Sequence, residues 1–363
     1  MSTLKFVRKN VRRLKALKED FNLTKDFVRM DYSVSKLPPS PKVMEAMSSA
    51  YEEVNNYPDG SARGLRKALA KYNKVSSDAI IVGNGSDEII DMISRTFLEQ
   101  EDEVVIFTPT YSFYEYSAKI VGAKVKSISS MIDKTYAIDP IKVKKRISLR
   151  TKIIWICNPN NPTGNAIPQE SIEKILETTD CIVVVDECFF EFLGRTCLHL
   201  LEKFDRLIIV RSMSKNFGLA GLRIGYAIAN TEIIDNIWKV KPLFNVNSIA
   251  QVAAIAALED IDYYEDVWKK VANERKYLTE RLSNLERIEV FPSTTNFLLI
   301  NVRKCRENPT RIYDKLIQRK ILVLPSWSID FSGLKPGFFR ILVSTREEND
   351  RFLKELSKVI GNC

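Results

Sequence analysis

Two ionisable residues stand shortly after apolar runs of the sequence and could carry covalent chemistry and proton transfer. Lys215 comes after the run that ends at Val210. Ligand sites of α/β proteins lie beyond strand ends, where a desolvated lysine has a lowered pKa and can form a Schiff base. An exposed loop lysine is the alternative. Asp186 follows the run Val183–Val185, where a carboxylate needs a cation or donor as partner unless it is a helix N-cap.

Hydroxyl, guanidinium and amide groups elsewhere in the sequence are suited to binding a phosphate. Three such residues flank Lys215: Ser212, Ser214 and Arg223. The segment Gly83–Ile90 has the pattern of a strand, a glycine turn and a helix start, whose first amides and dipole could hold an anion. The residues at that turn are Gly85, Ser86 and Asp87. Ser86 could equally be an ordinary N-cap.

Two further residues complete the set. Tyr111 follows Thr108–Thr110, and Asn161 lies in a Pro- and Gly-rich segment after the run that ends at Ile156. All these residues come just past successive apolar runs. Together they supply what pyridoxal phosphate requires: a phosphate cup, a stacking ring, a donor to the phenolic oxygen, a carboxylate at the pyridine nitrogen and a Schiff-base lysine.

The elements that must position these residues are short Val- and Ile-rich runs that alternate with helical stretches. The runs occupy 79–82, 104–107, 124–128, 152–156, 181–185, 206–210 and 224–228. Such near-continuous apolar runs are typical of strands buried on both faces. Segments between them, such as 86–99 and 171–179, have helical spacing. The pattern predicts a large α/β domain with a mostly parallel central sheet flanked by helices.

The pattern changes from Pro242 onward. A long helical region from 248 to about 285 precedes strands and helices in mixed order. The predicted strands are 288–291, 296–302, 321–324 and 339–343, and the predicted helices are 310–319 and 347–359. This predicts a smaller α+β domain. We expect an N-terminal arm (1–37) packed on the small domain or a partner subunit, a large cofactor-binding domain (38–245) and a small C-terminal domain (246–363).

Composition excludes several classes of function. A single histidine, His199, and six cysteines without a CxxC pair predict reduced thiols and no metal site. No run approaches the ~20 apolar residues of a spanning helix, so we expect a cytoplasmic protein without a membrane partner. The net charge is +9 and the N-terminus is basic. Apolar residues nevertheless recur there at helical spacing, which favours a packed amphipathic helix over nucleic-acid binding: Leu4, Val7, Val11, Leu14 and Leu17.

Two long motifs carry a resemblance to a known family. They are Ser-Lys-Asn-Phe-Gly-Leu-Ala-Gly-Leu-Arg-Ile-Gly-Tyr at 214–226 and Asn-Pro-Asn-Asn-Pro-Thr-Gly at 158–164. The chain resembles the fold-type I pyridoxal-phosphate enzymes of the class I and II aminotransferase group, most closely the histidinol-phosphate aminotransferases. The resemblance extends from Asp31 to Asn349. It implies an aspartate-aminotransferase-like fold, pyridoxal 5'-phosphate as cofactor and a homodimer.

The resemblance also implies roles for individual residues. Lys215 would form the Schiff base and move the substrate proton, and Asp186 would keep the pyridine nitrogen protonated. Asn161 would donate to the phenolic oxygen, and Tyr111 would stack on the ring. The phosphate would be bound by the turn at Gly85 and by Ser86, Asp87, Ser212, Ser214 and Arg223. Tyr57 would reach that phosphate from the partner subunit, and Arg340 would pair with an anionic group of the substrate.

Three positions depart from the family pattern. Phe189 replaces the tyrosine that usually donates to the phenolic oxygen, as it does in related threonine-phosphate decarboxylases. Ser35–Leu37 replaces an Asn-Glu-Asn box. Leu324 replaces an arginine that binds the substrate phosphate, which removes the best partner for a dianion.

The resemblance implies a ping-pong aminotransferase acting on a small-molecule amino donor and a 2-oxo acid. In the family reaction, histidinol phosphate and 2-oxoglutarate give imidazole acetol phosphate and glutamate. Leu324 motivates an alternative, an aminotransferase for an aromatic or other amino acid. A threonine-phosphate-decarboxylase-like enzyme is a further alternative, disfavoured because the chain lacks a His-Gly-Gly-Asn stretch near its start. A catalytically silent binding module would be expected to lack Lys215 or Asp186, and both are present.

Overall fold

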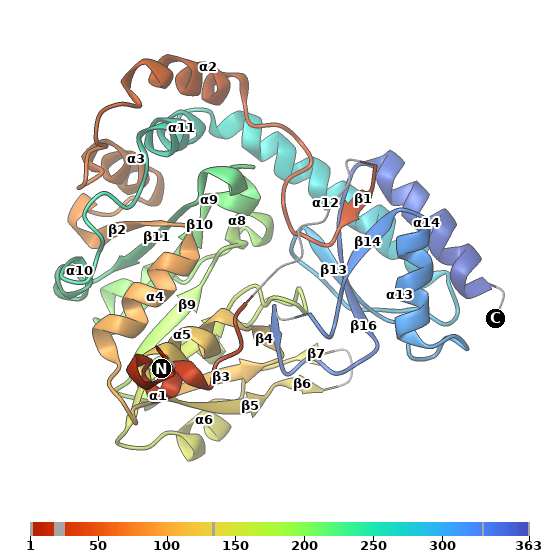
Figure 1. Cartoon of the computed structure of the whole chain (residues 1–363), viewed down its shortest axis with the longest axis horizontal. Helices are drawn as coiled ribbons and strands as arrows, with labels where there is room; N and C mark the ends of the chain where they lie inside the picture. Colours follow the sequence, from red (N-terminus) through yellow and green to blue (C-terminus); the bar gives the residue numbers. More distant parts are fainter. Residues whose placement is uncertain (1–2, 18–25, 133–134, 329, 362–363) are drawn as a thin grey trace.

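The computed structural model describes residues 3–17, 26–132, 135–328 and 330–361. Besides two short strand pairs they form two larger sheets, each with its own helices, seen side by side in Figure 1. The larger sheet has seven strands in the order β2-β11-β10-β9-β8-β3-β5. Their bounds are Ile80–Asn84 (β2), Ile224–Ala229 (β11), Leu207–Ser212 (β10), Ile182–Asp186 (β9), Thr151–Cys157 (β8), Glu103–Thr108 (β3) and Lys124–Ser129 (β5). Of the seven strands, β11 alone runs in the opposite direction to the others, so the predicted mostly parallel sheet is confirmed.

Helices cover both faces of the large sheet. One face carries α4 (Ser86–Phe97), α5 (Phe113–Val121) and α10 (Thr231–Trp238). The other carries α2 (Pro41–Ala50), α3 (Arg63–Asn73), α6 (Pro140–Arg146), α7 (Gln169–Thr178) and α11 (Ser248–Leu258). Alternate side chains of β9 enter the two cores: Val183 and Val185 pack on one face, Val184 on the other. Burial on both faces explains the unbroken apolar runs of the sequence.

The smaller sheet has five strands in the order β1-β14-β16-β13-β12. The bounds are Val28–Met30 (β1), Ile321–Pro325 (β14), Phe338–Leu342 (β16), Phe297–Asn301 (β13) and Glu289–Val290 (β12). Its core is closed by α12 (Ile261–Ser283), α13 (Pro309–Gln318) and α14 (Arg346–Gly361). The predicted helical region 248–285 is thus two helices, and α11 packs in the core of the large sheet. The domain boundary at 245/246 remains a prediction.

Short elements connect these layers and carry site residues. They are α8 (Phe190–Leu193), α9 (Met213–Asn216), the pair β4 (Thr110–Tyr111) with β15 (Phe331–Ser332), and the hairpin β6 (Met131–Ile132) with β7 (Thr135–Tyr136). The β4–β15 pair joins a loop of the large sheet to a segment between β14 and β16 of the small sheet. No helix of the described residues has the length and apolar character needed to cross a membrane.

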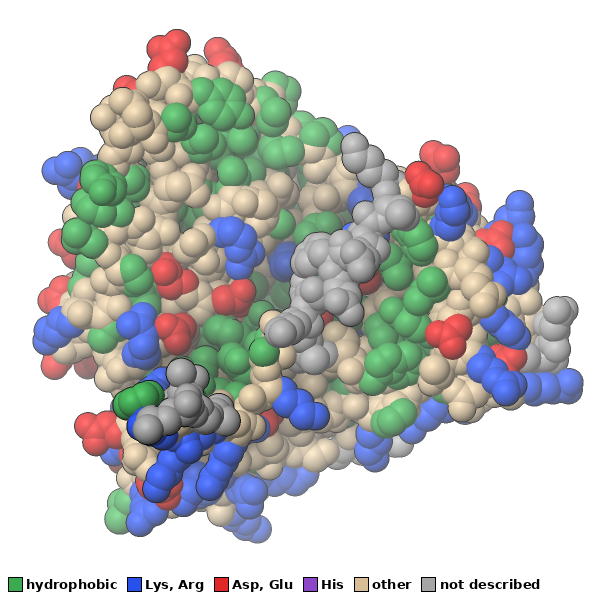
Figure 2. All heavy atoms as spheres, viewed as in Figure 1, with side chains coloured by type: hydrophobic (Ala, Val, Ile, Leu, Met, Phe, Trp, Pro, Cys, Tyr) green, Lys and Arg blue, Asp and Glu red, His purple; other side chains and the backbone are tan. Residues whose placement is uncertain are grey.

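The N-terminal arm differs from the predicted amphipathic helix over residues 4–17. It has a 3-10 turn at Thr3–Phe6 and a single α-helical turn, α1 (Lys9–Arg12), while Leu14 and Leu17 lie outside any helix. The Nδ2 of Asn10 donates to the carbonyls of Lys119 (3.1 Å) and Ile120 (2.6 Å) in α5. Further along, β1 pairs with β14, so the arm contacts both parts of the molecule. Basic side chains gather around α1 in Figure 2. Lys18, the last residue of the basic run, lies outside the described residues.

Candidate active site

A cavity of about 190 Å³ lies beyond the carboxyl ends of β8, β9 and β10. It collects residues from both sheets. The predicted site residues that line it are Ser86, Asp87, Tyr111, Asn161, Asp186, Ser212, Ser214, Lys215, Arg223 and Arg340. In parallel sheets the carboxyl ends of neighbouring strands meet at one edge, which brings residues distant in sequence into one site.

Asp186 is the last residue of β9 and is 5% exposed. Its Oδ1 accepts the backbone N–H of Cys188 (2.9 Å), and its Oδ2 accepts the hydroxyl of Tyr114 (2.5 Å). Burial raises the pKa of the Asp186 carboxyl above its ordinary value, and these two hydrogen bonds oppose that rise. Because both donors are neutral, the carboxylate is suited to a cationic partner in the cavity.

Lys215 lies in α9, a single turn that begins directly after β10. The turn is capped by Ser212, whose Oγ accepts the backbone N–H of Ser214 (3.2 Å). Desolvation lowers the pKa of the Lys215 amine, and the guanidinium of Arg340 lowers it further. A lowered pKa increases the fraction of neutral, nucleophilic amine near neutral pH.

The start of α4 forms a cradle for an anion. Gly85 is its N-cap and has a φ of +83°, a conformation that favours glycine. A Cβ at Gly225 would lie 2.3 Å from the amide nitrogen of Ser86, so β11 packs directly against this turn. Gly85 has no side chain to cap the helix, which leaves first-turn amides for a ligand. A Cβ at Gly85 would lie 2.4 Å from Nη2 of Arg223, so this glycine makes room for the guanidinium.

Asp87 connects the cradle to the aromatic wall of the cavity. Its Oδ2 pairs with Nη2 of Arg223 (3.0 Å), and its Oδ1 accepts the hydroxyl of Tyr111 (2.9 Å). Burial, followed by the negative charge of Asp87, raises the pKa of Tyr111 well above its ordinary value. Tyr111 therefore stays a neutral phenol that donates its one proton to Asp87 and can present its ring to a ligand.

Arg340 on β16 is 6% exposed, and within the described part of the chain its hydrogen-bond acceptors are an amide oxygen and a carbonyl oxygen, not a carboxylate. Its Nη1 donates to Oδ1 of Asn161 (2.7 Å) and its Nη2 to the carbonyl of Asp31 (2.9 Å). Burial lowers the pKa of the Arg340 guanidinium to about 10. A buried guanidinium whose charge is met by these neutral acceptors is suited to binding an anionic group of a substrate. Because Asn161 uses its oxygen on Arg340, its Nδ2 remains available to donate to a ligand.

Several lining residues were missed by the sequence reasoning. They are Tyr32, Ser33, Tyr114, Cys157, Cys188 and Asp330. Tyr114 follows Tyr111 at i+3, a spacing that could have placed both on one side of a helix start. Phe189 also lines the cavity, so this departure from the family pattern falls within the site. Cys157, Cys181 and Cys188 are buried free thiols.

Two predicted residues do not line the cavity. Gly85 lies against the guanidinium of Arg223, and its missing side chain leaves room for that group. Tyr57 is 83% exposed and stacks on Phe244, with ring centroids 4.7 Å apart. Its predicted contact involves a partner subunit and remains a prediction. Leu324, a further departure, is 8% exposed and lies opposite Arg340 in the β14–β16 register.

Comparisons with known proteins agree with this arrangement. Residues 26–356 match the family model described as aminotransferase class I and II. A histidinol-phosphate aminotransferase of Methanosphaera stadtmanae is 34% identical over 350 residues, 96% of this chain and 95% of the relative. The same enzyme of Methanocaldococcus jannaschii is 35% identical over 339 residues, 93% of this chain and 90% of the relative.

Solved structures give the same result for the fold. The histidinol-phosphate aminotransferase of Clostridium acetobutylicum matches with a TM-score of 0.84 and 28% identity, covering 92% of this chain and 99% of that chain. The enzyme of Sinorhizobium meliloti, solved in complex with pyridoxal-5'-phosphate, matches with a TM-score of 0.83 and 26% identity, covering 92% and 91%. An aspartate aminotransferase mutant of Thermus thermophilus also matches with a TM-score of 0.84 and 22% identity, covering 97% of this chain and 99% of that chain, so the predicted aspartate-aminotransferase-like fold is confirmed.

Proposed function

The chain belongs to the class I and II aminotransferase family, and from this premise we propose that it transfers an amino group between histidinol phosphate and 2-oxoglutarate, using pyridoxal phosphate. The products would be imidazole acetol phosphate and glutamate. One observation carries the proposal: a lysine, a buried carboxylate, an anion cradle and a buried arginine line a single cavity.

The donor set of this cavity fits pyridoxal phosphate. When bound, this cofactor supplies a protonated pyridine ring that withdraws electrons from the substrate Cα. Nζ of Lys215 would hold its aldehyde carbon, and the Asp186 carboxylate would hold its ring nitrogen. Nδ2 of Asn161 would donate to the phenolic oxygen, and Tyr111 would contact the ring. Asp186 has neutral donors as neighbours, so a protonated ring nitrogen would supply the missing cation.

The phosphate of the cofactor would lie at the start of α4. The amides of Ser86 and Asp87 and the hydroxyls of Ser212 and Ser214 are neutral donors, and Arg223 adds a positive charge. The charge of Arg223 is partly compensated by Asp87, 3.0 Å away. The helix dipole and the hydroxyls therefore contribute to binding the dianion.

Two residues would act on the substrate. Arg340 would bind an anionic group and hold the substrate with Cα next to Lys215, because both residues line the cavity. Nζ of Lys215 would take the proton from Cα and return it at the adjacent cofactor carbon, as its lowered pKa permits. Both half-reactions bring an anion to Arg340, the phosphate of one substrate and a carboxylate of the other.

A second substrate class is supported by Leu324. This apolar residue lies opposite Arg340 in the register of β14 and β16, where a second cation would favour a dianion. An aminotransferase for an aromatic or other amino acid, with one carboxylate at Arg340, is the function this residue favours. The curated relatives named histidinol-phosphate aminotransferase support the first candidate.

We propose a homodimer as the functional unit. Exposed large apolar side chains occur on neighbouring segments of the large domain: Met44, Tyr51, Val54, Tyr57, Leu243 and Phe244. Figure 2 shows hydrophobic side chains gathered over the α2 region. Exposed apolar surface of this kind is typical of protein interfaces. We further propose a cytoplasmic location, where reduced thiols such as the five buried cysteines of the described residues persist.

A half-reaction screen tests the substrate. Purified protein loaded with pyridoxal phosphate is mixed in turn with histidinol phosphate, phenylalanine and glutamate, and conversion of the cofactor to its amine form is followed by absorbance. We expect fast conversion with histidinol phosphate and glutamate, and reversal by 2-oxoglutarate. Fast conversion with phenylalanine alone would contradict histidinol phosphate as substrate. A protein that acquires no cofactor band would contradict the entire proposal.

A further inference from the structure

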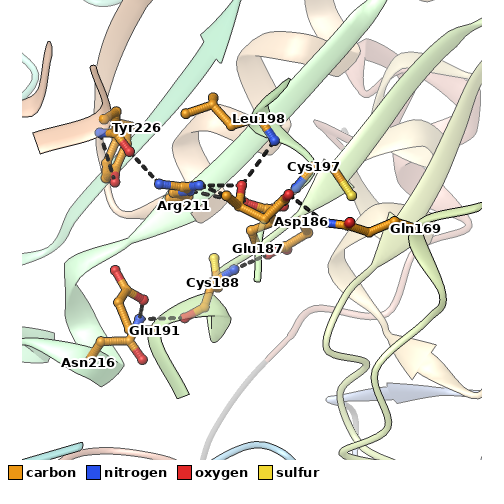
Figure 3. A network of polar contacts seen from close by, with 12 residues as sticks. Gln169, Asp186, Glu187, Cys188, Glu191, Cys197, Leu198, Arg211, Asn216 and Tyr226 are labelled. Atoms are coloured by element: carbon orange, nitrogen blue, oxygen red, sulfur yellow. Dashed lines mark hydrogen bonds and ion pairs between the residues drawn. The ribbon is translucent and has the colours of Figure 1, made fainter. Parts of the chain in front are cut away.

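A buried polar network surrounds the residues that follow Asp186 and Lys215 in the chain (Figure 3). Its centre is the ion pair of Glu187 and Arg211, which are 1% and 2% exposed. The Oε2 of Glu187 accepts Nε (3.1 Å) and Nη2 (2.8 Å) of Arg211. Its Oε1 accepts the backbone N–H of Cys197 (2.6 Å). This pair ties the end of β9 to β10, from which α9 continues.

Asn216 makes a second connection, closer to the site. Its Nδ2 donates to the carbonyl of Cys188 (3.0 Å) and to Oε2 of Glu191. Its own backbone carbonyl accepts Nε1 of Trp268 in α12 (2.8 Å). The residue after Lys215 is therefore bonded to the segment that follows Asp186, to α8 and to α12.

The position of Lys215 depends on such contacts because α9 is only four residues long. A single helical turn is unstable by itself and is held by tertiary interactions. Asn216 is 1% exposed. Removing its side-chain amide would take this donor away from the buried Cys188 carbonyl and from the Glu191 carboxyl, which costs stability at both acceptors.

We propose that Asn216 is a positioning residue: its side-chain amide, held between Cys188 and Glu191, fixes α9 so that Nζ of Lys215 keeps its place relative to Asp186. This inference rests on the proposed function, since position matters only if Lys215 and Asp186 act on one bound group. Asn216 does not line the cavity, so its effect passes through Lys215. Displacements of about 1 Å at reacting atoms can cost about 100-fold in rate.

The test compares three variants with a control. N216A removes the donor, and E191A removes its acceptor on α8. E191Q keeps an amide oxygen at that position and so keeps the acceptor. The control is N236A, because Asn236 donates its Nδ2 to the Glu232 carbonyl of its own surface helix (2.8 Å). Each protein is loaded with pyridoxal phosphate, and three quantities are measured: kcat, KM and the pH midpoint of the visible cofactor band.

For N216A we expect kcat to fall by about 10- to 100-fold with a smaller change in KM, and the pH midpoint of the band to shift. E191A should change in the same direction, while E191Q should be closer to wild type and N236A unchanged. A purely structural role would lower thermal stability without moving the band midpoint. If N216A does not fold, N216S and E191A carry the same expectation.

The outcomes separate this inference from the function on which it rests. Wild-type protein without a cofactor band would overturn the proposed function. A wild-type band together with an unchanged kcat and midpoint in N216A would overturn the positioning role alone.

Discussion

The hydroxyl of Tyr114 lies 2.5 Å from Oδ2 of Asp186 and donates a hydrogen bond to it. Tyr114 is held by stacking on Trp155, with ring centroids 5.0 Å apart. A residue of α5 thus supports the carboxylate at the end of β9 from inside the core. Because the donor is neutral, Asp186 keeps its negative charge available for the cavity.

The first prediction concerns this hydrogen bond. Y114F should lower the free energy of unfolding by about 1–3 kcal/mol, because Oδ2 of a buried carboxylate loses its donor. The matched control is Y116F, on the same helix, where the Tyr116 ring stacks on Phe113. Its change should stay within about 0.5 kcal/mol. Urea unfolding of the cofactor-free proteins measures both, and equal effects would contradict the assigned hydrogen bond.

The second prediction concerns the buried ion pair. R211M should destabilise the protein by about 3–5 kcal/mol, because it leaves the Glu187 carboxylate buried without its cation. The double variant E187Q/R211M should recover part of this loss. K203M is the control, since Lys203 and Glu173 form a solvent-exposed pair at 2.5 Å, and exposed pairs contribute little to stability. Denaturant unfolding compares them, and a cost for R211M no larger than for K203M would refute the prediction.

The third prediction is a pH dependence of stability. Burial raises the pKa of the Glu191 carboxyl from 4.5 to about 8, opposed by the positive charge of Arg211. The other titratable groups that face it are Glu187, directly after β9, and Tyr72 on α3. The folded state therefore binds more protons than the unfolded state between these two values. The stability from Glu191 is fully present below about pH 4.5 and is lost as pH rises through about 8.

The E191Q variant has no carboxyl group at this position, so it tests the predicted direction in which the stability changes with pH. The free energy of unfolding should fall less steeply with pH in E191Q than in wild type between pH 4.5 and about 8. Chemical unfolding at several pH values gives the two slopes. Parallel slopes would show that Glu191 does not titrate in this range.

The fourth prediction concerns substrate binding. R340A should weaken binding of the anionic substrate by about 2–4 kcal/mol, because the substrate anion loses a desolvated partner. R340K should keep part of this binding energy but lose the bidentate geometry. KM and the cofactor band are measured together. An unchanged KM, or a loss of cofactor instead of substrate, would remove Arg340 from the substrate site.

Much of the large sheet could be predicted because its strands are buried on both faces. The run Val183–Val185 is apolar throughout. The structure places its side chains alternately in the two hydrophobic cores on the opposite faces of the sheet. The site residues after these strands could be predicted for the same reason, since strand ends define where the loops begin. Asp186, Lys215 and Asn161 were found in this way.

Other features depend on contacts that no local pattern indicates. The predicted N-terminal helix is wrong over most of its length. Its basic residues have no acidic residue among them, so no ion pair at i, i+4 supports the helix and like charges repel. Asp330 reaches the cavity through the two-residue pairing of β15 with β4, which is too short to leave a periodic signal.

Covalent labelling tests the central claim most directly. The purified protein is incubated with pyridoxal phosphate, reduced with borohydride, digested and analysed by mass spectrometry, with K215A as the parallel sample. The account predicts a phosphopyridoxyl group on the peptide that contains Lys215, and none on the corresponding peptide of K215A. A wild-type protein that carries the group on other lysines but not on Lys215 would contradict it.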